Sequence, residues 1–384
     1  MKKNMKKGFH NDFKTLTILS ICLAACFAFA FFLNRSERPA DIPGNMAEYE
    51  NGKVLEILSD NTFQDETADG AWRGEQMLTV LVTTGRYKGE TLLAYNYVGP
   101  IYSVPVKEGD GVTLIISSYA DGSHNATVYE INRLPGILII LALFVTITVI
   151  VGGRNGAKSL LGLLFIALSL ATILLPGLMK GASTVLLTFA VSTFIAAFSL
   201  AIMSGINKKT VCAFLGTVAG VAMALLFAML AQSILRVDGL RQENVEALLQ
   251  LNNTGMKIGL KGLLSAAVII GSLGAVMDVT MGLASAISEL HETDPELDLK
   301  QLFLSGMNIG KDMVGTITST LIMAFLGSSF VLILYLYSLS LSKYQLLSSA
   351  YLSSELIASL SSSIGAILAV PITAFISAKA FSKK

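Results

Sequence analysis

The sequence predicts an α-helical polytopic membrane protein with about eight transmembrane helices and a small β-rich extracytoplasmic domain after the first helix. Three observations favour this fold class. The composition is 53% hydrophobic and 14% charged, with a mean hydropathy of +0.64, whereas soluble proteins average about 25% charged residues. Several apolar runs are long enough to cross a bilayer core of ~30 Å. Short alternating runs with turn residues between them follow the first apolar run.

The first apolar run, residues 15–33, follows a basic N-terminal tail and is predicted to be an uncleaved membrane anchor. Residues 23–26, Leu-Ala-Ala-Cys, resemble a bacterial lipobox, so lipidation of Cys26 is the alternative. The apolar sequence continues over residues 27–33, whereas a lipidated cysteine is usually followed by polar sequence. We therefore expect residues 1–33 to form a cytoplasmic tail and an anchor.

Residues 34–133 are predicted to form the extracytoplasmic β-rich domain. The expected strands are residues 53–58, 77–84, 91–97 and 112–118. Residues 102–112 resemble a strand and turn of a small β-barrel, and an ordinary hairpin is the alternative. The aromatic residues of this region either line a binding face or occupy core and membrane-interface positions. They are Trp72, Tyr87, Tyr95, Tyr97 and Tyr102.

Residues 134–384 are predicted to form a seven-helix membrane domain. The expected spans are residues 134–151, 160–178, 182–203, 211–231, 262–283, 315–337 and 360–380. In this order, four clusters of Lys and Arg lie on the side of the basic N-terminal tail. The positive-inside rule therefore predicts that both termini face the cytoplasm of a bacterial plasma membrane. The basic residues of the loop at 232–261 lie on the opposite side and do not follow this rule. The opposite membrane orientation would place this one cluster in the cytoplasm but the other four outside.

Asp278 is predicted to lie within the hydrocarbon part of its span, about five residues or ~8 Å beyond the midpoint. A carboxylate near the centre of a membrane helix costs on the order of 2.5 to 3.5 kcal/mol even on mild insertion scales. We therefore expect Asp278 to face protein, water or a partner cation. A residue with this cost is more easily explained by function than by structure.

Two polar stripes are expected on the helices on either side of the acidic loop at residues 290–298. Residues on one helix face recur at intervals of three and four. The first stripe comprises Asp278, Gly282, Ser285 and Glu289, and the second comprises Asn308, Asp312, Thr316 and Ser319. If the stripes meet across an antiparallel pair, they form a hydrophilic track from the cytoplasm toward mid-membrane. Lys311 either contributes to this track or reaches the lipid headgroups.

The loop between these helices does not predict a metal or cofactor site. His291 lies near several acidic residues, but a single histidine without partners at ligand spacing is usually solvated. Asp294 and Pro295 are interpreted as the cap and first residue of the following helix. No run of basic residues interleaved with aromatic ones indicates nucleic-acid binding.

Two long blocks carry a family resemblance. GSLGAVMDVTMGLASAISELHETDP, at residues 271–295, and LFLSGMNIGKDMVGTITSTLIMAFLGSS, at residues 302–329, resemble the signature of the YibE/F-like bacterial membrane proteins. The resemblance covers roughly residues 130–384. It implies a multi-pass membrane fold, and it does not imply a substrate or an activity.

The leading functional hypothesis is a secondary transporter or permease for a small solute or ion. Asp278 would bind or relay a proton or cation, and the inner path would be lined by the remaining candidates. These candidates are Asn308, Asp312, Thr316, Glu289 and Lys311. The alternative is a membrane scaffold or sensor whose β-domain binds a protein partner. An enzyme is not expected, because no GxSxG or HExxH motif is present.

Overall fold

The computed structural model of the protein describes residues 47–118, 124–241, 245–253 and 257–382. The chain divides into two compact units, and the boundary falls inside a long helix, between Ile150 and Val151. The predicted anchor at residues 15–33, which includes Cys26, lies outside the described residues.

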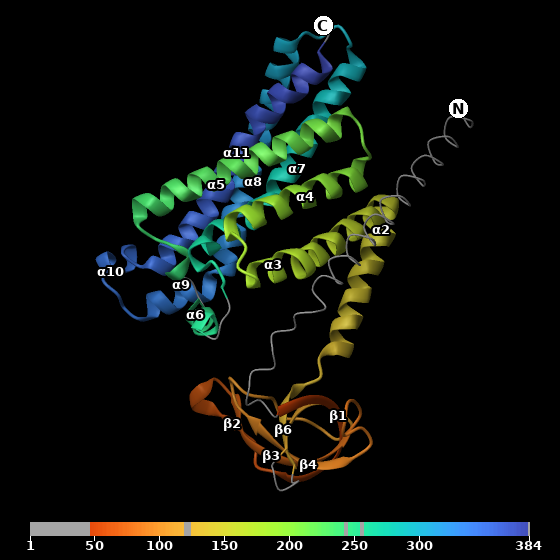
Figure 1. The fold of residues 1–384 in the computed structure, drawn as a ribbon, viewed down its shortest axis with the longest axis vertical. Helices are drawn as coiled ribbons and strands as arrows, with labels where there is room; N and C mark the ends of the chain where they lie inside the picture. The colour runs from red at the N-terminus through yellow and green to blue at the C-terminus, as the bar shows by residue number, and fades with distance from the viewer. Residues whose placement is uncertain (1–46, 119–123, 242–244, 254–256, 383–384) are drawn as a thin grey trace, which may run out of the picture. The chain divides into compact units, whose positions relative to one another are not determined.

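The first unit contains a closed five-strand β-barrel (Figure 1). Its strands are β1 (Ala47–Asp60), β3 (Ala71–Val82), β4 (Thr91–Val98), β5 (Gly111–Ser118) and β6 (His124–Ile131). The order around the barrel is β1-β5-β6-β4-β3, and β1 closes it by pairing with β3 as well. Only β4 and β6 run parallel among these pairs. This order, with a long first strand that pairs on both sides, is the topology of an OB-fold.

The barrel confirms the predicted β-rich domain and all four of its expected strands. Two further strands were not predicted. β2 (Phe63–Asp65) is a short extension that pairs with β3. β6 completes the barrel, but its inward-facing residues include the small Ala126, so its apolar alternation is weak in the sequence. Its place is decided by pairing with β4 and β5, which are distant in sequence.

A buried pair of amides holds the segment between β4 and β5 against the barrel. Gln76 Oε1 accepts hydrogen bonds from the Val106 backbone N–H and from Asn96 Nδ2, both at 2.9 Å. Gln76 Nε2 donates to the Val106 carbonyl at 3.1 Å and to Asp60 Oδ2 at 2.9 Å. Asn96 Nδ2 also donates to the Val104 carbonyl at 3.0 Å. Both amide side chains are buried, so these bonds are shielded from competing water.

We expect Gln76→Leu to lower the free energy of unfolding of the barrel by about 2 to 4 kcal/mol. Leucine is similar in size, but it leaves the Val106 backbone groups buried without partners and removes one of the two hydrogen bonds of Asn96 Nδ2. Trp72, the one tryptophan of the chain, lies on β3 and reports thermal unfolding of the barrel by fluorescence. Gln64→Leu on the exposed face of β2 is the matched control. Equal melting temperatures for the two variants would contradict this prediction.

The helices of the chain run from α2 to α11. They are α2 (Leu134–Ser169), α3 (Leu175–Met179), α4 (Thr184–Ser204), α5 (Lys208–Leu235), α6 (Val245–Asn253), α7 (Leu263–Thr293), α8 (Leu299–Ser328), α9 (Phe330–Ser338), α10 (Lys343–Leu347) and α11 (Ala350–Phe381). Within the described residues, six helical stretches are long and apolar enough to cross a membrane. In the second unit, α11 packs against α5, α7 and α8, and α7 also packs against α4 and α5.

Two predicted spans, residues 134–151 and 160–178, belong to one helical stretch, Leu134–Met179. The polar residues between them do not end the helix, because Arg154, Asn155 and Lys158 are compatible with helical backbone. Gly153 interrupts it instead, with φ 54° and ψ −130°, a conformation that glycine adopts at little cost. Six candidate helices are therefore described in this region, where seven spans were expected.

The helix that carries the second polar stripe has other ends than predicted. The helix was expected to start at Pro295 and its membrane span was expected at residues 315–337. α8 instead runs from Leu299 to Ser328, and α9 follows it as a separate short helix. Asp298 caps α8: its Oδ1 accepts from the Gln301 N–H at 2.7 Å, and Gln301 Oε1 accepts from the Asp298 N–H at 3.0 Å. The predicted cap at Asp294 is wrong, because Asp294 ends α7. A capping box outcompetes a single Asx cap by satisfying two backbone donors.

The connections between the long helices lie at two ends of the helical unit. Figure 1 shows the α7–α8 connection at the same end as the C-terminus, and α6, α9 and α10 at the opposite end. Lys300 follows the α7–α8 connection, and Lys379 lies in the last turn of α11. These two basic positions therefore share one end, as the sequence predicted.

Candidate functional site

The candidate site is centred on Asp278 in α7. The structure extends this helix to Thr293, ten residues beyond the predicted span, which places Asp278 at the helix midpoint. One face of α7 packs on α4, α5 and α11, through buried residues that include Val276, Val279 and Thr280. Asp278 lies on the other face and is exposed. It makes no hydrogen bond or ion pair with another described residue.

The neighbouring helices do not cover Asp278, and no described residue pairs with it. None of the described acidic side chains is buried. The residues one turn before and after Asp278, Gly274 and Gly282, are both exposed glycines. Space around Gly274 is open, since a Cβ added there would meet nothing within 4 Å. The small residues leave the middle of this helix face uncovered, and they permit close approach by another group.

The predicted track between the two polar stripes is wrong. α8 presents apolar side chains to α7: a Cβ added at Gly282 would lie 3.1 Å from Met313 Cε, and one added at Gly271 would lie 3.6 Å from Phe325 Cζ. The second stripe is exposed on α8, and so are Lys311 and Glu289. The stripe comprises Asn308, Asp312, Thr316 and Ser319.

Two hydroxyls of the α8 stripe are satisfied by their own helix. Thr316 Oγ1 donates to the Met313 carbonyl at 3.0 Å, and Ser319 Oγ donates to the Gly315 carbonyl at 3.0 Å. A hydroxyl bonded to its own helix tolerates an apolar environment better than a free one. Asp312 of the stripe and the neighbouring Lys311 have charged side chains and lack this option.

The helical core contains polar groups that sequence reasoning missed. Thr217 of α5 and Thr280 of α7 share a buried hydrogen bond of 2.7 Å between their hydroxyls. α11 carries four buried hydroxyls without a hydrogen-bond partner among the described residues: Ser361, Ser362, Thr373 and Ser377. For Ser361 and Ser362, the signal in the sequence is the serine-rich segment at residues 359–363, which lies inside an otherwise apolar helix. Buried polar groups without partners are uncommon and call for an explanation.

Sequence reasoning also missed Glu355. It precedes the span expected at residues 360–380, but it lies in the second turn of α11, and Ser329 Oγ donates to its Oε2 at 2.6 Å. Ser329 is buried at the junction of α8 and α9. The pair borders a cavity of about 100 Å³ that is lined mainly by apolar residues such as Phe325 and Leu356. Glu355 could have been noticed as the one acidic residue after Asp312.

The acidic loop is not organised around a metal in the described part of the chain, where no group of three or more His, Cys, Asp or Glu side chains could hold one. His291 packs toward the end of α11, with its ring centroid 5.9 Å from that of Phe381. Its Nδ1 is buried without a hydrogen-bond partner among the described residues.

The fold defines the class of protein to which the chain belongs. Six long apolar helices within the described residues, with many apolar side chains exposed along α2 and α8, make it a multi-span membrane protein in contact with the lipid bilayer. The family model of YibE/F-like proteins matches residues 140–383. The chain therefore belongs to the YibE/F-like family, as its two motif blocks indicated. No curated protein and no solved structure shows detectable similarity to it.

Proposed function

We propose that the protein is a secondary transporter or permease for a small solute or ion, in which Asp278 binds the coupling proton or cation. The observation that carries this proposal is an accessible carboxylate at the midpoint of a candidate membrane helix. Such a group is costly in lipid, and ionisable residues within membrane helices usually belong to substrate, ion or proton pathways.

The polar groups of the helical core support the same function. Transporters change the packing of their helices, and the groups that line the path in one state are covered in another. The four buried hydroxyls of α11 and the Thr217–Thr280 pair provide polar lining for such a path. Asn308, Asp312 and Thr316, with Glu289 and Lys311, would then serve as an exposed approach from the cytoplasm.

The proposed topology has eight spans and both termini in the cytoplasm of a bacterial plasma membrane. The helical stretch Leu134–Met179 would be ~69 Å long at 1.5 Å per residue if it were straight, whereas a bilayer core measures ~30 Å. The break at Gly153 leaves a suitable length for one crossing on each side. The basic residues at the C-terminal end of the helical unit favour its cytoplasmic placement, which puts the β-barrel outside.

Ion binding by the full chain tests this proposal without knowledge of the solute. Proteoliposomes adsorbed on a solid-supported membrane report charge displacement when the proton or sodium concentration is raised suddenly. We expect a protein-dependent transient for one of these ions, since Asp278 would take up the ion within the membrane field. Lack of a transient for both ions would exclude this coupling mechanism.

A second candidate function is a membrane scaffold or sensor, and the closed barrel with its exposed aromatic surface favours it. Removing residues 47–131 distinguishes the two candidates. A transporter is expected to keep its ion-dependent charge displacement when the barrel is absent. A scaffold shows no displacement with or without the barrel.

A further inference from the structure

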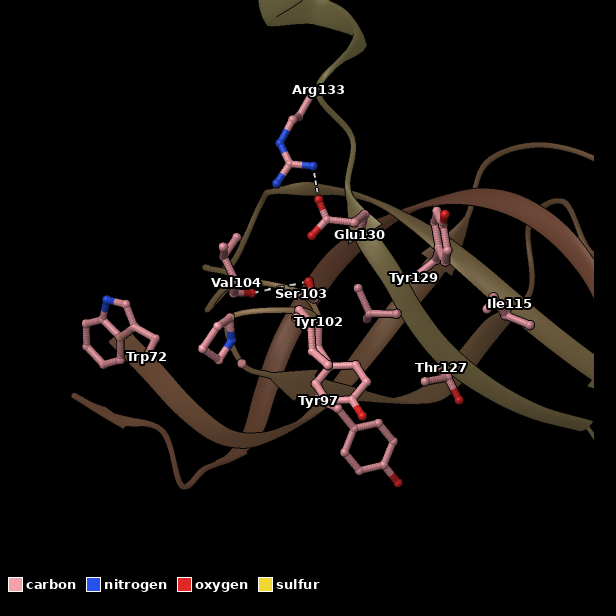
Figure 2. Close-up of a pocket in the computed structure, with 14 residues that line it drawn as sticks. Trp72, Tyr97, Tyr102, Ser103, Val104, Ile115, Thr127, Tyr129, Glu130 and Arg133 are labelled. Carbon is pink, nitrogen blue, oxygen red and sulfur yellow. Dashed lines mark hydrogen bonds and ion pairs between the residues drawn. The ribbon is translucent and has the colours of Figure 1, made fainter. Parts of the chain in front are cut away.

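The β-barrel carries a groove of about 700 Å³ lined by aromatic side chains (Figure 2). Trp72 of β3 lies at one side, Tyr129 of β6 lies at the other, and Tyr97 and Tyr102 lie between them. These four rings are 43%, 55%, 50% and 66% exposed, respectively. The volume is within the usual range of small-ligand sites, about 300 to 1,000 Å³. Four rings that are each about half exposed in one hollow indicate a surface that stacks against a ligand.

The wall of the groove is fixed before any ligand binds. The Tyr102 N–H donates to the Gly99 carbonyl at 3.0 Å, and the Ser103 N–H donates to the Tyr97 carbonyl at 3.2 Å. The buried amides of Gln76 and Asn96 hold Val104 and Val106 immediately beyond this turn. On the far side, the ring of Tyr129 packs edge-on against Tyr49, with 5.5 Å between the ring centroids. A rigid wall lowers the entropic cost of binding.

The groove also offers polar groups beside its rings. Glu130 and Arg133 form an ion pair at one edge, and the Thr127 side chain lies at the other (Figure 2). Tyrosine combines an apolar ring with a hydroxyl that hydrogen-bonds. Flat apolar faces bordered by hydroxyl, carboxylate and guanidinium groups match the chemistry of a sugar ring, which has C–H faces and hydroxyls at its edge.

The charge of the domain excludes the main competing ligand of such a barrel. OB-fold surfaces bind oligonucleotides or oligosaccharides. Single-stranded nucleic acids stack on aromatic rings too, but they require a positively charged groove. Residues 47–133 contain thirteen acidic residues and six basic ones. A polyanion would be repelled by this domain, whereas a neutral glycan would not.

We propose that this aromatic groove binds a neutral oligosaccharide, with sugar rings stacked on Trp72, Tyr97 and Tyr102. The proposal does not depend on transport through the helical unit. The oligosaccharide would bind to the barrel, whereas the coupling ion would bind at Asp278 of the helical unit.

Fluorescence of Trp72 tests the proposal directly, because the chain has one tryptophan and it lines the groove. The full chain is purified in lauryldimethylamine oxide, since maltoside and glucoside detergents have sugar head groups that would compete. It is titrated with cellotetraose, maltotetraose and chitotetraose. We expect a saturable change in emission with at least one of them. The absence of a saturable change with all three would overturn the proposal.

Variants locate the binding surface. Tyr97→Ala and Tyr102→Ala are each expected to weaken binding roughly tenfold, as removal of one stacking ring should. Leu93→Ala is the matched control, because Leu93 is exposed on the same strand as Tyr97 and lies outside the groove. Equal affinities for all three variants would contradict the assignment.

Two further outcomes would also overturn it. Saturable binding of oligothymidylate in place of the sugars would make the groove a nucleic-acid site. Quenching of Trp72 by brominated phospholipids in vesicles would show that the aromatic rings lie in the bilayer surface, where tyrosine and tryptophan also accumulate.

Discussion

Asp278→Asn is expected to abolish the ion-dependent charge displacement, or to reduce it at least about tenfold. Asparagine preserves the size of the side chain and its capacity for hydrogen bonds, but it neither takes up a proton nor balances a cation. The carboxylate is exposed at the midpoint of α7 and has no partner among the described residues. Loss of a favourable interaction of ~1.4 kcal/mol is sufficient for a tenfold effect.

The same substitution is expected to leave the protein folded and slightly more stable. A neutral amide removes the cost of holding a charge at hydrocarbon depth, and function commonly opposes stability at such positions. We expect an increase in melting temperature of about 2–5 °C. Glu292 is an exposed carboxylate in the last turn of α7, and Glu292→Gln is the matched control. It should change neither the charge displacement nor the melting temperature. Unchanged charge displacement in Asp278→Asn would remove this residue from the mechanism.

Gly365→Ala is expected to destabilise the helical unit by about 1 to 3 kcal/mol. Gly365 of α11 lies against Gly220 of α5, and an added Cβ would lie 2.6 Å from Ala224 Cβ and 2.9 Å from the Gly220 carbonyl oxygen. A backbone oxygen cannot move aside as a flexible side chain can, so the two helices must separate. Close backbone approach at small residues is a main source of association between membrane helices. The melting temperature of the full chain in detergent measures the effect.

Gly315→Ala is the matched control for this packing prediction. Gly315 lies in the middle of α8, and a Cβ added there would meet nothing within 4 Å. Alanine favours a helix over glycine by up to about 1 kcal/mol, so this variant should be as stable as the native chain or slightly more stable. Equal losses of stability in the two variants would show that α5 and α11 do not depend on this contact.

Most of the fold could be predicted because each element depends on a local pattern. A bilayer requires long apolar helices, and the runs over α4, α5, α7 and α11 are continuous in the sequence. The barrel strands β1, β3, β4 and β5 alternate clearly. Helix ends were less accurate, because Gly153 and the capping box at Asp298 act through backbone geometry and not through hydropathy.

The site divides in the same way. That Asp278 lies inside a long apolar helix could be predicted, since its neighbours along the chain are apolar. That it is exposed could not be predicted, because its exposure depends on how α8 packs. Met313 and Phe325 of α8 lie against α7 at Gly282 and Gly271, and the part of α7 between these two glycines stays open. The hydrogen bond between Ser329 and Glu355 joins residues 26 apart in sequence, so no local pattern indicates it.

Local sequence was therefore enough to establish a multi-pass membrane protein with a β-domain and an acidic residue within a membrane helix. The length of an apolar run and the alternation of apolar and polar residues are properties of short segments. Water and lipid therefore favour the helix or strand before tertiary contacts form. Closure of the barrel by β6, formation of the aromatic groove and exposure of Asp278 were established by packing. Each of these brings together strands or helices far apart in the chain, and their contacts depend on shapes that no single segment contains.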